Sequence, residues 1–360
     1  MFKTVRGNRK KAQAELNRLL HQQETGCVIE PSQATVGEYL LLQWLPFIAT
    51  LVAPKTYERY KDIVLNKLIP ALGKIKLNEL QPLHIQNYYS RELNSGRTNG
   101  NGGLSAQTVL HHHRVLRAAL RQAVKWQLLH RNPADAVQPP KPERKEMQTL
   151  DEAQTVRMLE AAAGTRVHIP LLIAVTTGMR RGEFLAIRWS DIDFQAGIIY
   201  VRRSVEQTKD GLRFKPTKTR NGRPIVLLPL AAEALRAHRS AQEERKKLLG
   251  KAYQDLDLVC CQEDGSIWPP DNFSAAFKSF ARRAKLTGVR LHDMRHTHAT
   301  QMLGHGIHPK IVSERLGHST IAITMDIYSH VMPTMQSEAA ETMNAALKKA
   351  MEASEMQSRV

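Results

Sequence analysis

LHDMRHTHATQMLGHGIHPKIVSERLGHSTIAITMDIYSH, residues 291–330, gathers a hydroxyl, guanidinium groups and imidazoles in one short stretch. An arginine presents its donors in a planar fork that matches two oxygens of a phosphate. A tyrosine oxygen can form a covalent intermediate once a nearby base takes its proton. The set therefore suits attack on a phosphodiester better than attack on an amide or a sugar. Its members, in chain order, are His292, Arg295, His318 and Tyr328.

Two structural explanations compete with this interpretation. A single tyrosine in a helical segment is most often a core or interface residue. His292 and His296 stand four residues apart, a spacing that can hold zinc on one helix face. The HExxH motif is absent, however, and Arg295 would be a poor neighbour for a metal cation. The catalytic interpretation rests on the order of the whole set and requires a partner upstream.

The size and charge of the chain indicate two domains and a polyanionic partner. A chain of 360 residues is too long for one small core. Lys and Arg outnumber Asp and Glu by 52 to 34, which gives a net charge of +18 and an isoelectric point of about 9.9. Nucleic acid is the first partner that such an excess indicates, although ribosomal and membrane-surface proteins share it.

Cysteine usage and the apolar runs predict a soluble, cytosolic protein. Of the three cysteines, Cys27, Cys260 and Cys261, two are adjacent, so the three cannot build a disulfide framework or a four-ligand zinc site. No run of eighteen apolar residues occurs, and the start MFKTVRGNRKK lacks the apolar core of a signal peptide.

A helical domain is predicted over residues 33–137, preceded by a basic helix within residues 1–30. That first helix, expected over residues 3–24, is either a DNA-contacting arm or a solvated face. Thr35-x-x-Glu38 is a capping box that opens the next helix. Later helices are expected over Thr56–Ile69, stopped by Pro70 and Gly73, from Pro82 to about Leu93, and from Ser105 to about Leu129.

The helix that begins at Ser105 combines an apolar side with a cationic side of the kind that contacts phosphates. The consecutive histidines 111–113 cannot converge on one metal ion, because successive helix positions point in different directions. We expect these histidines to face solvent or DNA. The basic residues predicted to contact DNA from this helix are Arg114, Arg117, Arg121 and Lys125.

A linker rich in Pro and charge, residues 138–148, leads to a second domain over residues 149–335. Thr149–Glu152 reads as a capping box that opens a helix through Ala163. An apolar helix, HIPLLIAVTT, comes next and is followed by a further helix, FLAIRW. Arg180 lies between these two helices, flanked by glycines that let a ligand approach, and is a candidate for the upstream phosphate clamp.

Strands follow these helices. GIIYVRRSVEQ alternates with a period of two, and RFKPTKTRNGRPIVLLPL carries a turn signal at Asn221-Gly222, so a hairpin is expected there. Most of its cations would contact backbone phosphates or solvent, and one lysine near the turn is a candidate general acid for the leaving oxygen. Spacing alone does not say which lysine. The cations of this region are Lys209, Arg213, Lys215, Lys218, Arg220 and Arg223.

Four segments together resemble the signature segments of the tyrosine recombinase (phage integrase) family. They are TGMRRGEFLAIRWSDID, TKTRNGRPI, LHDMRHTHAT and LGHSTIAITMDIYSH, in the family's order and at its separations. The resemblance covers about residues 35–335. It implies a site-specific recombinase, the integrase of a phage or mobile element, which cuts and rejoins DNA through a 3′-phosphotyrosyl intermediate without metal, ATP or another cofactor.

The resemblance also implies a role for each matching residue. Arg180 and Arg295 match the pair of arginines that clamps the scissile phosphate, and Tyr328 matches the nucleophile. The remaining matches are Lys218 with the hairpin lysine, His292 with the first histidine of the second box, His318 with the later His/Trp position, and Glu183 with the acidic residue that supports the first arginine. Lys215 and Arg220 are predicted to contact DNA.

The fold that the resemblance implies is mainly helical with a small β-sheet. A SAM-like core-binding domain and a catalytic domain would form a C-shaped clamp on duplex DNA at attachment-type core sites. Larger relatives carry a β-rich arm-binding domain, and residues 1–30 resemble only the helix that would connect to it. The enzyme is expected to act at the nucleoid as a tetrameric synapse, with a DNA-bending or excision-directing accessory protein as a further candidate partner.

The tail, residues 336–360, is predicted to form a helix with Ala340, Met343, Leu347 and Ala350 on one side. That side packs either within the chain or on a neighbouring protomer.

Three other functions compete with the interpretation of the chain as an integrase. A DNA-binding regulator would explain the charge but not six matched polar residues. A type IB topoisomerase shares the nucleophile chemistry and would relax supercoils without specific sites. A metal nuclease would need a cluster of carboxylates near these motifs.

Overall fold

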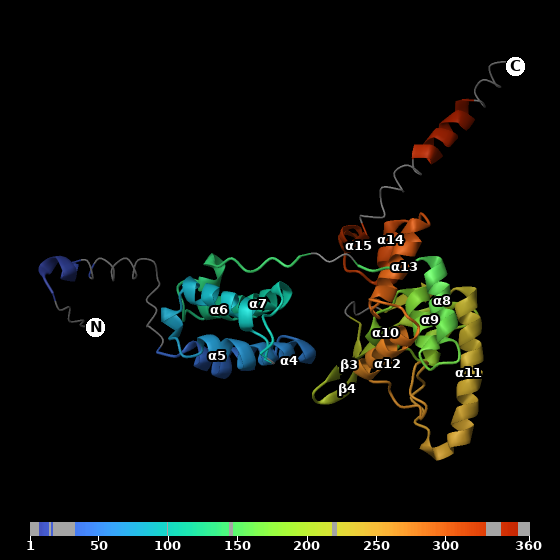
Figure 1. The fold of residues 1–360 in the computed structure, drawn as a ribbon, viewed down its shortest axis with the longest axis horizontal. Coiled ribbons are helices and arrows are strands. Elements are labelled where there is room, and N and C mark those ends of the chain that lie inside the picture. The colour runs from blue at the N-terminus through green and yellow to red at the C-terminus, as the bar shows by residue number, and fades with distance from the viewer. Residues whose placement is uncertain are drawn as a thin grey trace. The chain divides into compact units, whose positions relative to one another are not determined.

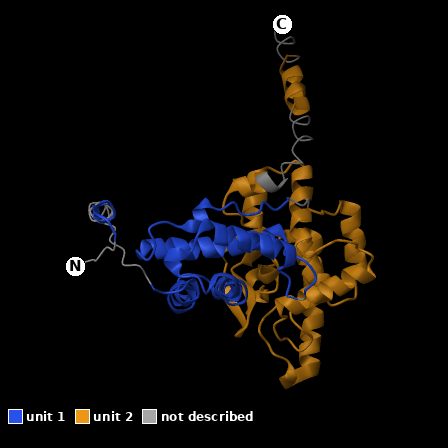
Figure 2. Cartoon of the chain, turned by 60° about the vertical axis from the view of Figure 1, so that its left-hand side comes forward, with its two compact units in different colours: residues 1–145 blue, residues 146–360 orange. Residues whose placement is uncertain are grey.

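The computed structural model describes residues 7–13, 16, 33–98, 100–143, 147–217, 222–328 and 340–351. The chain divides into two compact units, residues 1–145 and residues 146–360, which Figure 2 draws in different colours. Each unit has its own hydrophobic core. Helices dominate both, and two small antiparallel sheets lie in the second unit (Figure 1). The predicted fold class is therefore confirmed. The basic helix expected over residues 3–24 falls mostly outside the described residues.

Unit 1 consists of helices packed around Tyr39, Trp44 and Tyr89, which are buried. Thr35 and Glu38 form the predicted capping box, in which the Glu38 amide donates to Thr35 Oγ1 and the Thr35 amide donates to Glu38 Oε2. The elements are α2 (Val36–Glu38), η1 (Tyr39–Trp44), α3 (Leu45–Ala49), α4 (Pro54–Ile63), η2 (Val64–Leu68), α5 (Ile69–Leu72), η3 (Leu77–Glu79), α6 (Pro82–Ser95), α7 (Ala106–Lys125) and η4 (Pro133–Ala136).

Two prolines of unit 1 lie inside helices instead of ending them. Pro46 and Pro70 each follow a stretch of π-helix, η1 and η2. A proline lacks an N–H and its ring crowds the carbonyl four residues earlier, and the wider π turn accommodates both effects. The prediction that Pro70 stops the helix is wrong, because the helix that begins at Pro54 continues to Leu72.

The histidines of α7 correct another prediction. His112 and His113 are buried rather than facing solvent or DNA. The Tyr88 hydroxyl is hydrogen-bonded to His112 Nδ1 (2.7 Å), and the Tyr89 hydroxyl to His113 Nδ1 (2.8 Å). Burial is the largest cause of a lowered pKa at both histidines, to about 4 at His112. Their apolar ring faces and neutral charge let them join α7 to α6 from inside the core.

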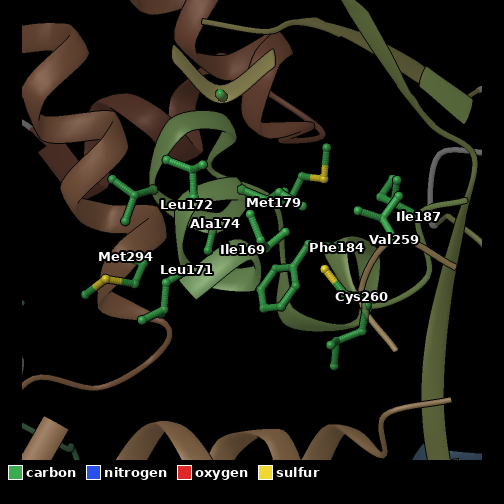
Figure 3. Close-up of a cluster of buried hydrophobic side chains, with 14 of the residues drawn as sticks. Ile169, Leu171, Leu172, Ala174, Met179, Phe184, Ile187, Val259, Cys260 and Met294 are labelled. Carbon is green, nitrogen blue, oxygen red and sulfur yellow. The ribbon is translucent and has the colours of Figure 1, made fainter. Parts of the chain in front are cut away.

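Unit 2 is built around α9, which is buried along nearly its whole length because its sequence is apolar on every side. Figure 3 shows its residues Leu171, Leu172 and Ala174 among side chains from several other segments. The helical elements are α8 (Glu152–Ala162), α9 (His168–Thr177), α10 (Arg181–Phe184), η5 (Trp189–Asp191), α11 (Pro229–Leu249), η6 (Gly250–Ala252), α12 (Pro270–Arg283), α13 (Asp293–Gly304), α14 (Pro309–Leu316) and α15 (Ile321–Tyr328), and residues 340–351 are also helical.

The strands pair differently from the prediction. They are β1 (Ile192–Asp193), β2 (Ile198–Val201), β3 (Arg203–Thr208), β4 (Gly211–Pro216) and β5 (Arg223–Val226). β3 and β4 form a hairpin that turns at residues 209–210, and β5 pairs with β2 in a separate sheet of order β1-β2-β5. A hairpin with its turn at 221–222 is therefore wrong. Pairing β5 with β2 places Ile225 opposite Ile199, and both are buried.

Two helix starts and ends in unit 2 also differ from the prediction. The capping box of α8 joins Asp151 and Gln154, not Thr149 and Glu152. α10 ends at Phe184, so FLAIRW is not a helix. Arg188 is extended, the Ile187 carbonyl accepts from the amide of the distant Val259, and Trp189 then begins η5. Among the described residues, no helix is long and apolar enough to cross a membrane.

Candidate active site

The C-terminal end of α9 forms the foundation of the candidate site. Gly178 caps α9 in the left-handed conformation, with φ of +65°. A Cβ added there would lie 2.5 Å from Leu316 Cδ2 and 2.7 Å from His298 Cδ2, so both the backbone and the packing require glycine. The Gly178 carbonyl accepts a hydrogen bond from Arg295 Nη1 (2.7 Å). Arg295 comes from α13 and is 4% exposed.

Arg180 follows two residues later as the N-cap of α10. Its Nη1 donates to Glu183 Oε1 (3.0 Å) and its Nη2 to the Gly317 carbonyl (3.3 Å). Its amide donates to Glu183 Oε2 (3.0 Å), so the same carboxylate also satisfies the backbone at the start of α10. The Arg180 side chain remains 40% exposed. The guanidinium group is thus oriented from one side and open to an anion from the other.

Glu183 is buried and joins Arg180 to a residue whose role the sequence did not reveal, Arg223 at the start of β5. Arg223 Nη2 donates to Glu183 Oε2 (2.7 Å) and its Nε to the Arg315 carbonyl (2.9 Å). Burial raises the pKa of Glu183, but the hydrogen bonds and charge of Arg223, with those of Arg180, outweigh it and hold the pKa below its ordinary value. Glu183 therefore stays ionised.

A signal for Arg223 does exist in the sequence. Arg223 and Ile225 share one face of β5, and Ile225 is buried, as is Leu227 just after the strand. An arginine on the apolar face of a strand needs an acidic partner inside the protein. Grouping Arg223 with the solvated cations of the expected hairpin obscured this.

His318 follows a Schellman-type end of α14. Gly317 adopts φ of +66°, its amide donates to the Glu314 carbonyl, and the His318 amide donates to the Ser313 carbonyl. His318 Nδ1 is hydrogen-bonded to Thr324 Oγ1 (2.8 Å), and Thr324 lies buried on α15. Burial, then the charges of the nearby arginines, lower the pKa of His318 to about 4. The ring is neutral at physiological pH.

His292 lies at the start of α13 beside His296, with ring centroids 4.8 Å apart in an edge-to-face arrangement. Although part of its surface is exposed, partial burial and then the charge of Arg295 lower its pKa. His292, Arg295 and Met179 line a pocket of about 270 Å³. A neutral imidazole at the mouth of a cationic pocket can accept a proton.

Some predicted site residues cannot be placed together with these. Lys218 and Arg220 lie outside the described residues. Tyr328 is the last residue of α15, and its side chain also lies outside them. The structure thus brings Arg180, Glu183, Arg295, His292 and His318 to the region around the ends of α9 and α14. Among the described residues, no group of three His, Cys, Asp or Glu side chains is arranged to hold a metal ion.

The predicted DNA contacts fall into two classes. Arg114, Arg121 and Lys125 are exposed on α7. Arg117 instead pairs with Asp135, with Nε and Oδ1 2.5 Å apart, and Lys215 pairs with Glu206 across the β3–β4 hairpin. To bind a phosphate, each of these two cations would have to break its ion pair or contact the carboxylate and the phosphate together.

The buried histidines predict that acid destabilises unit 2. The pKa of His296 is lowered to about 4, mainly by burial, from 6.5 in the unfolded chain. The unfolded state then binds more protons between these values, so stability is complete above pH 6.5 and falls as the pH drops toward 4, by up to about 1.4 kcal/mol per pH unit for one histidine. We expect the urea midpoint to decline over this range, and less steeply in His296→Gln. A midpoint with the same slope in both proteins would contradict this.

Arg223 should matter for folding as well as for the site. Arg223→Leu removes the more buried of the two cations that compensate the buried Glu183 and leaves only the half-exposed Arg180, and we expect it to cost about 3–5 kcal/mol of unfolding free energy. Lys246→Leu, which breaks the exposed pair with Asp255 in the same unit, is the control and should cost less than about 1 kcal/mol. Urea unfolding of the full chain measures both. Equal losses would mean that the Glu183 network is not structurally required.

Comparison with known proteins identifies the same family that the sequence motifs resemble. Residues 148–335 match the phage integrase family, and residues 36–93 match the N-terminal SAM-like domain of phage integrases. A tyrosine recombinase XerC-like protein from Caldanaerobacter subterraneus is 30% identical, over 93% of this chain and 89% of that relative. The ICEBs1 integrase of Bacillus subtilis is 29% identical, over 68% of this chain and 67% of its own length.

Solved structures share the fold. The Tn1549 transposon integrase in complex with transposon right end DNA aligns with a TM-score of 0.73 at 19% identity, covering 87% of this chain and 99% of that one. A lambda integrase dimer bound to a COC′ core site aligns with a TM-score of 0.60 at 18% identity, covering 91% and 88%. The family match over more than half of the sequence is decisive: the chain belongs to the phage integrase family of tyrosine recombinases, the enzymes that cut and rejoin DNA strands.

Proposed function

We propose that this recombinase acts on specific duplex DNA sites with Arg180 and Arg295 as its phosphate clamp and Tyr328 as its nucleophile. One observation carries the proposal. Arginines from two separate segments are fixed by backbone carbonyls at two helix ends, Arg295 by Gly178 after α9 and Arg180 by Gly317 after α14. Guanidinium groups held in this way are ready for an anion and need no rearrangement when charge develops on it.

The chemistry is a transesterification. The Tyr328 oxygen attacks the phosphorus as its proton passes to His292, and the 5′-oxygen leaves with a proton from Lys218. Arg180 and Arg295 stabilise the charge on the non-bridging oxygens, and each such donor typically contributes about 3 kcal/mol. His318 adds a neutral hydrogen-bond donor. The 3′-phosphotyrosyl bond retains the energy of the broken bond, so a second 5′-hydroxyl can reverse the step without ATP.

The surface charge supports a DNA substrate. The chain carries +18, and Arg114, Arg121 and Lys125 lie exposed along α7 in unit 1. Such residues contact phosphates without reading sequence. The solved relatives were captured with transposon end DNA and with a core site, which makes attachment-type sites the first substrates to test. A DNA substrate also implies that the enzyme works at the nucleoid, and a DNA-bending or excision-directing protein remains a candidate accessory factor.

Tyr328→Phe should abolish formation of a covalent protein–DNA adduct. Duplexes with a randomised segment and a single nick are suitable substrates, because the short fragment with the released 5′-hydroxyl diffuses away and traps the adduct. Adducts that survive denaturation are isolated, and their DNA is sequenced to identify the site. Tyr200→Phe is the matched control and should form adducts normally. Adducts formed by Tyr328→Phe, or none formed by the unsubstituted chain, would contradict the proposal.

The tail helix supports assembly on DNA as a multimer, for which a tetrameric synapse is the expected form. Every residue from 340 to 351 is exposed, and Met343 and Leu347 are 60% and 52% exposed on one side of the helix. A helix with an unpartnered apolar side gains stability by packing on a second protein surface. We propose that this surface belongs to a neighbouring protomer.

Met343→Ser combined with Leu347→Ser should therefore weaken synapsis more than single-site binding. Loss of two buried apolar side chains should lower the affinity between protomers by about tenfold or more. Lys348→Ser combined with Lys349→Ser changes the same helix elsewhere and serves as the control. Native gels resolve single-site complexes from synaptic ones on the DNA site identified above. Equal losses in both complexes, or equal effects of the two double variants, would refute the docking.

A further inference from the structure

His298 and Arg315 meet where three helices of unit 2 come together. His298 lies on α13, one turn after Arg295, and Arg315 lies in the last turn of α14. Arg315 Nε donates to His298 Nε2 (3.0 Å), and Arg315 Nη2 donates to the Thr176 carbonyl in the last turn of α9 (2.9 Å). His298 also makes a hydrogen bond with the Val175 backbone. The pair thus connects the ends of α9 and α14 through α13.

Both side chains are in the charge state that this contact requires. His298 is 7% exposed, and burial, followed by the charge of Arg315, lowers its pKa to about 3, so its ring is neutral. A neutral ring that accepts at Nε2 carries its proton on Nδ1, where it can donate to the backbone. Arg315 is partly buried, and burial is what lowers its pKa. Neutral acceptors from His298 and Thr176 solvate this guanidinium group where water is scarce.

The pair also borders the turn from which the first clamp arginine departs. His298 Cδ2 lies so close to Gly178 that an added Cβ would come within 2.7 Å of it. The carbonyl of Gly178 binds Arg295, and Arg180 follows two residues later. At the other end of the contact, Gly317 follows Arg315 by two residues, and its carbonyl binds Arg180. A change in the distance between His298 and Arg315 would therefore move the two carbonyls, of Gly178 and Gly317, that hold the clamp arginines.

We propose that His298 and Arg315 are positioning residues, which hold the two clamp arginines and the Gly317–His318 turn in register for the phosphate. The inference rests on the proposed function, because the register matters only if these groups act together on one phosphate. Each residue acts through the other: His298 Nε2 determines where the Arg315 side chain lies, and Arg315 fixes the end of α14 against α9. A misplacement of about 1 Å at reacting groups costs on the order of 100-fold in rate.

A double-mutant cycle tests this coupling. His298→Phe keeps a ring beside Gly178 but removes the acceptor for Arg315 Nε, and Arg315→Leu removes the donor. Each variant should slow adduct formation on the nicked duplex by on the order of 10- to 100-fold, with little change in binding of the intact duplex. The double variant should be no slower than the worse single variant, since the contact can be lost only once. His298→Gln, whose Oε1 can still accept, should restore much of the rate.

Thermal unfolding of every variant separates positioning from loss of fold. If His298→Phe does not fold, Arg315→Lys tests the same contact with a smaller change, because a lysine cannot reproduce the guanidinium fork that reaches both His298 and the Thr176 carbonyl. Losses that multiply in the double variant, normal cleavage by a folded His298→Phe, or equal losses in binding and cleavage would each overturn the inference. Failure of the unsubstituted chain to form an adduct would instead overturn the proposed function, so the two failures are distinguishable.

Discussion

One buried carboxylate allows the arginines of this site to lie together. Guanidinium groups repel one another, and a partly buried cluster of them forms only where negative charge compensates. Glu183 accepts from the side chains of both Arg180 and Arg223, and also from the Arg180 amide. The same group therefore neutralises charge, caps α10 and fixes the backbone from which Arg180 extends. Arg223 then transmits this constraint to the end of α14 by donating to the Arg315 carbonyl.

Glu183 does not neutralise all the arginines of the site, and the positive charge that remains acts on the nearby histidines. Burial and the surrounding arginines lower the pKa values of His292, His296 and His318, so without a ligand these rings are neutral. A phosphodiester brings a negative charge into the same region and acts in the opposite direction on each pKa. His292 would become a better proton acceptor once substrate is in place. The His292 imidazole would thus be more basic in the occupied site than in the free site, without any change in the fold.

The sequence predicted what local patterns determine. The capping box at Thr35 and Glu38 and the apolar helix α9 follow from short-range rules, and the structure has both. Motif order also identified the family, as the comparisons confirm. The roles of Lys218 and Tyr328 stay predictions, because Lys218 and the Tyr328 side chain lie outside the described residues.

The errors arose where distant residues decide the outcome. A turn signal at residues 221–222 suggested a hairpin, but β5 gains more by burying Ile225 against β2. Three adjacent histidines looked polar, yet two find tyrosine hydroxyls inside the core. Arg223 looked like one of many surface cations, and its partner Glu183 is 40 residues away in sequence.

The uniform burial of α9 has a further consequence for control of the enzyme. A helix packed on every side cannot shift without opening the core, whereas α15 leaves Ile321 and Met325 40% and 37% exposed. The proposed phosphate clamp is therefore built into the scaffold, and α15, which ends at the proposed nucleophile Tyr328, is where a partner could set the timing of the cut.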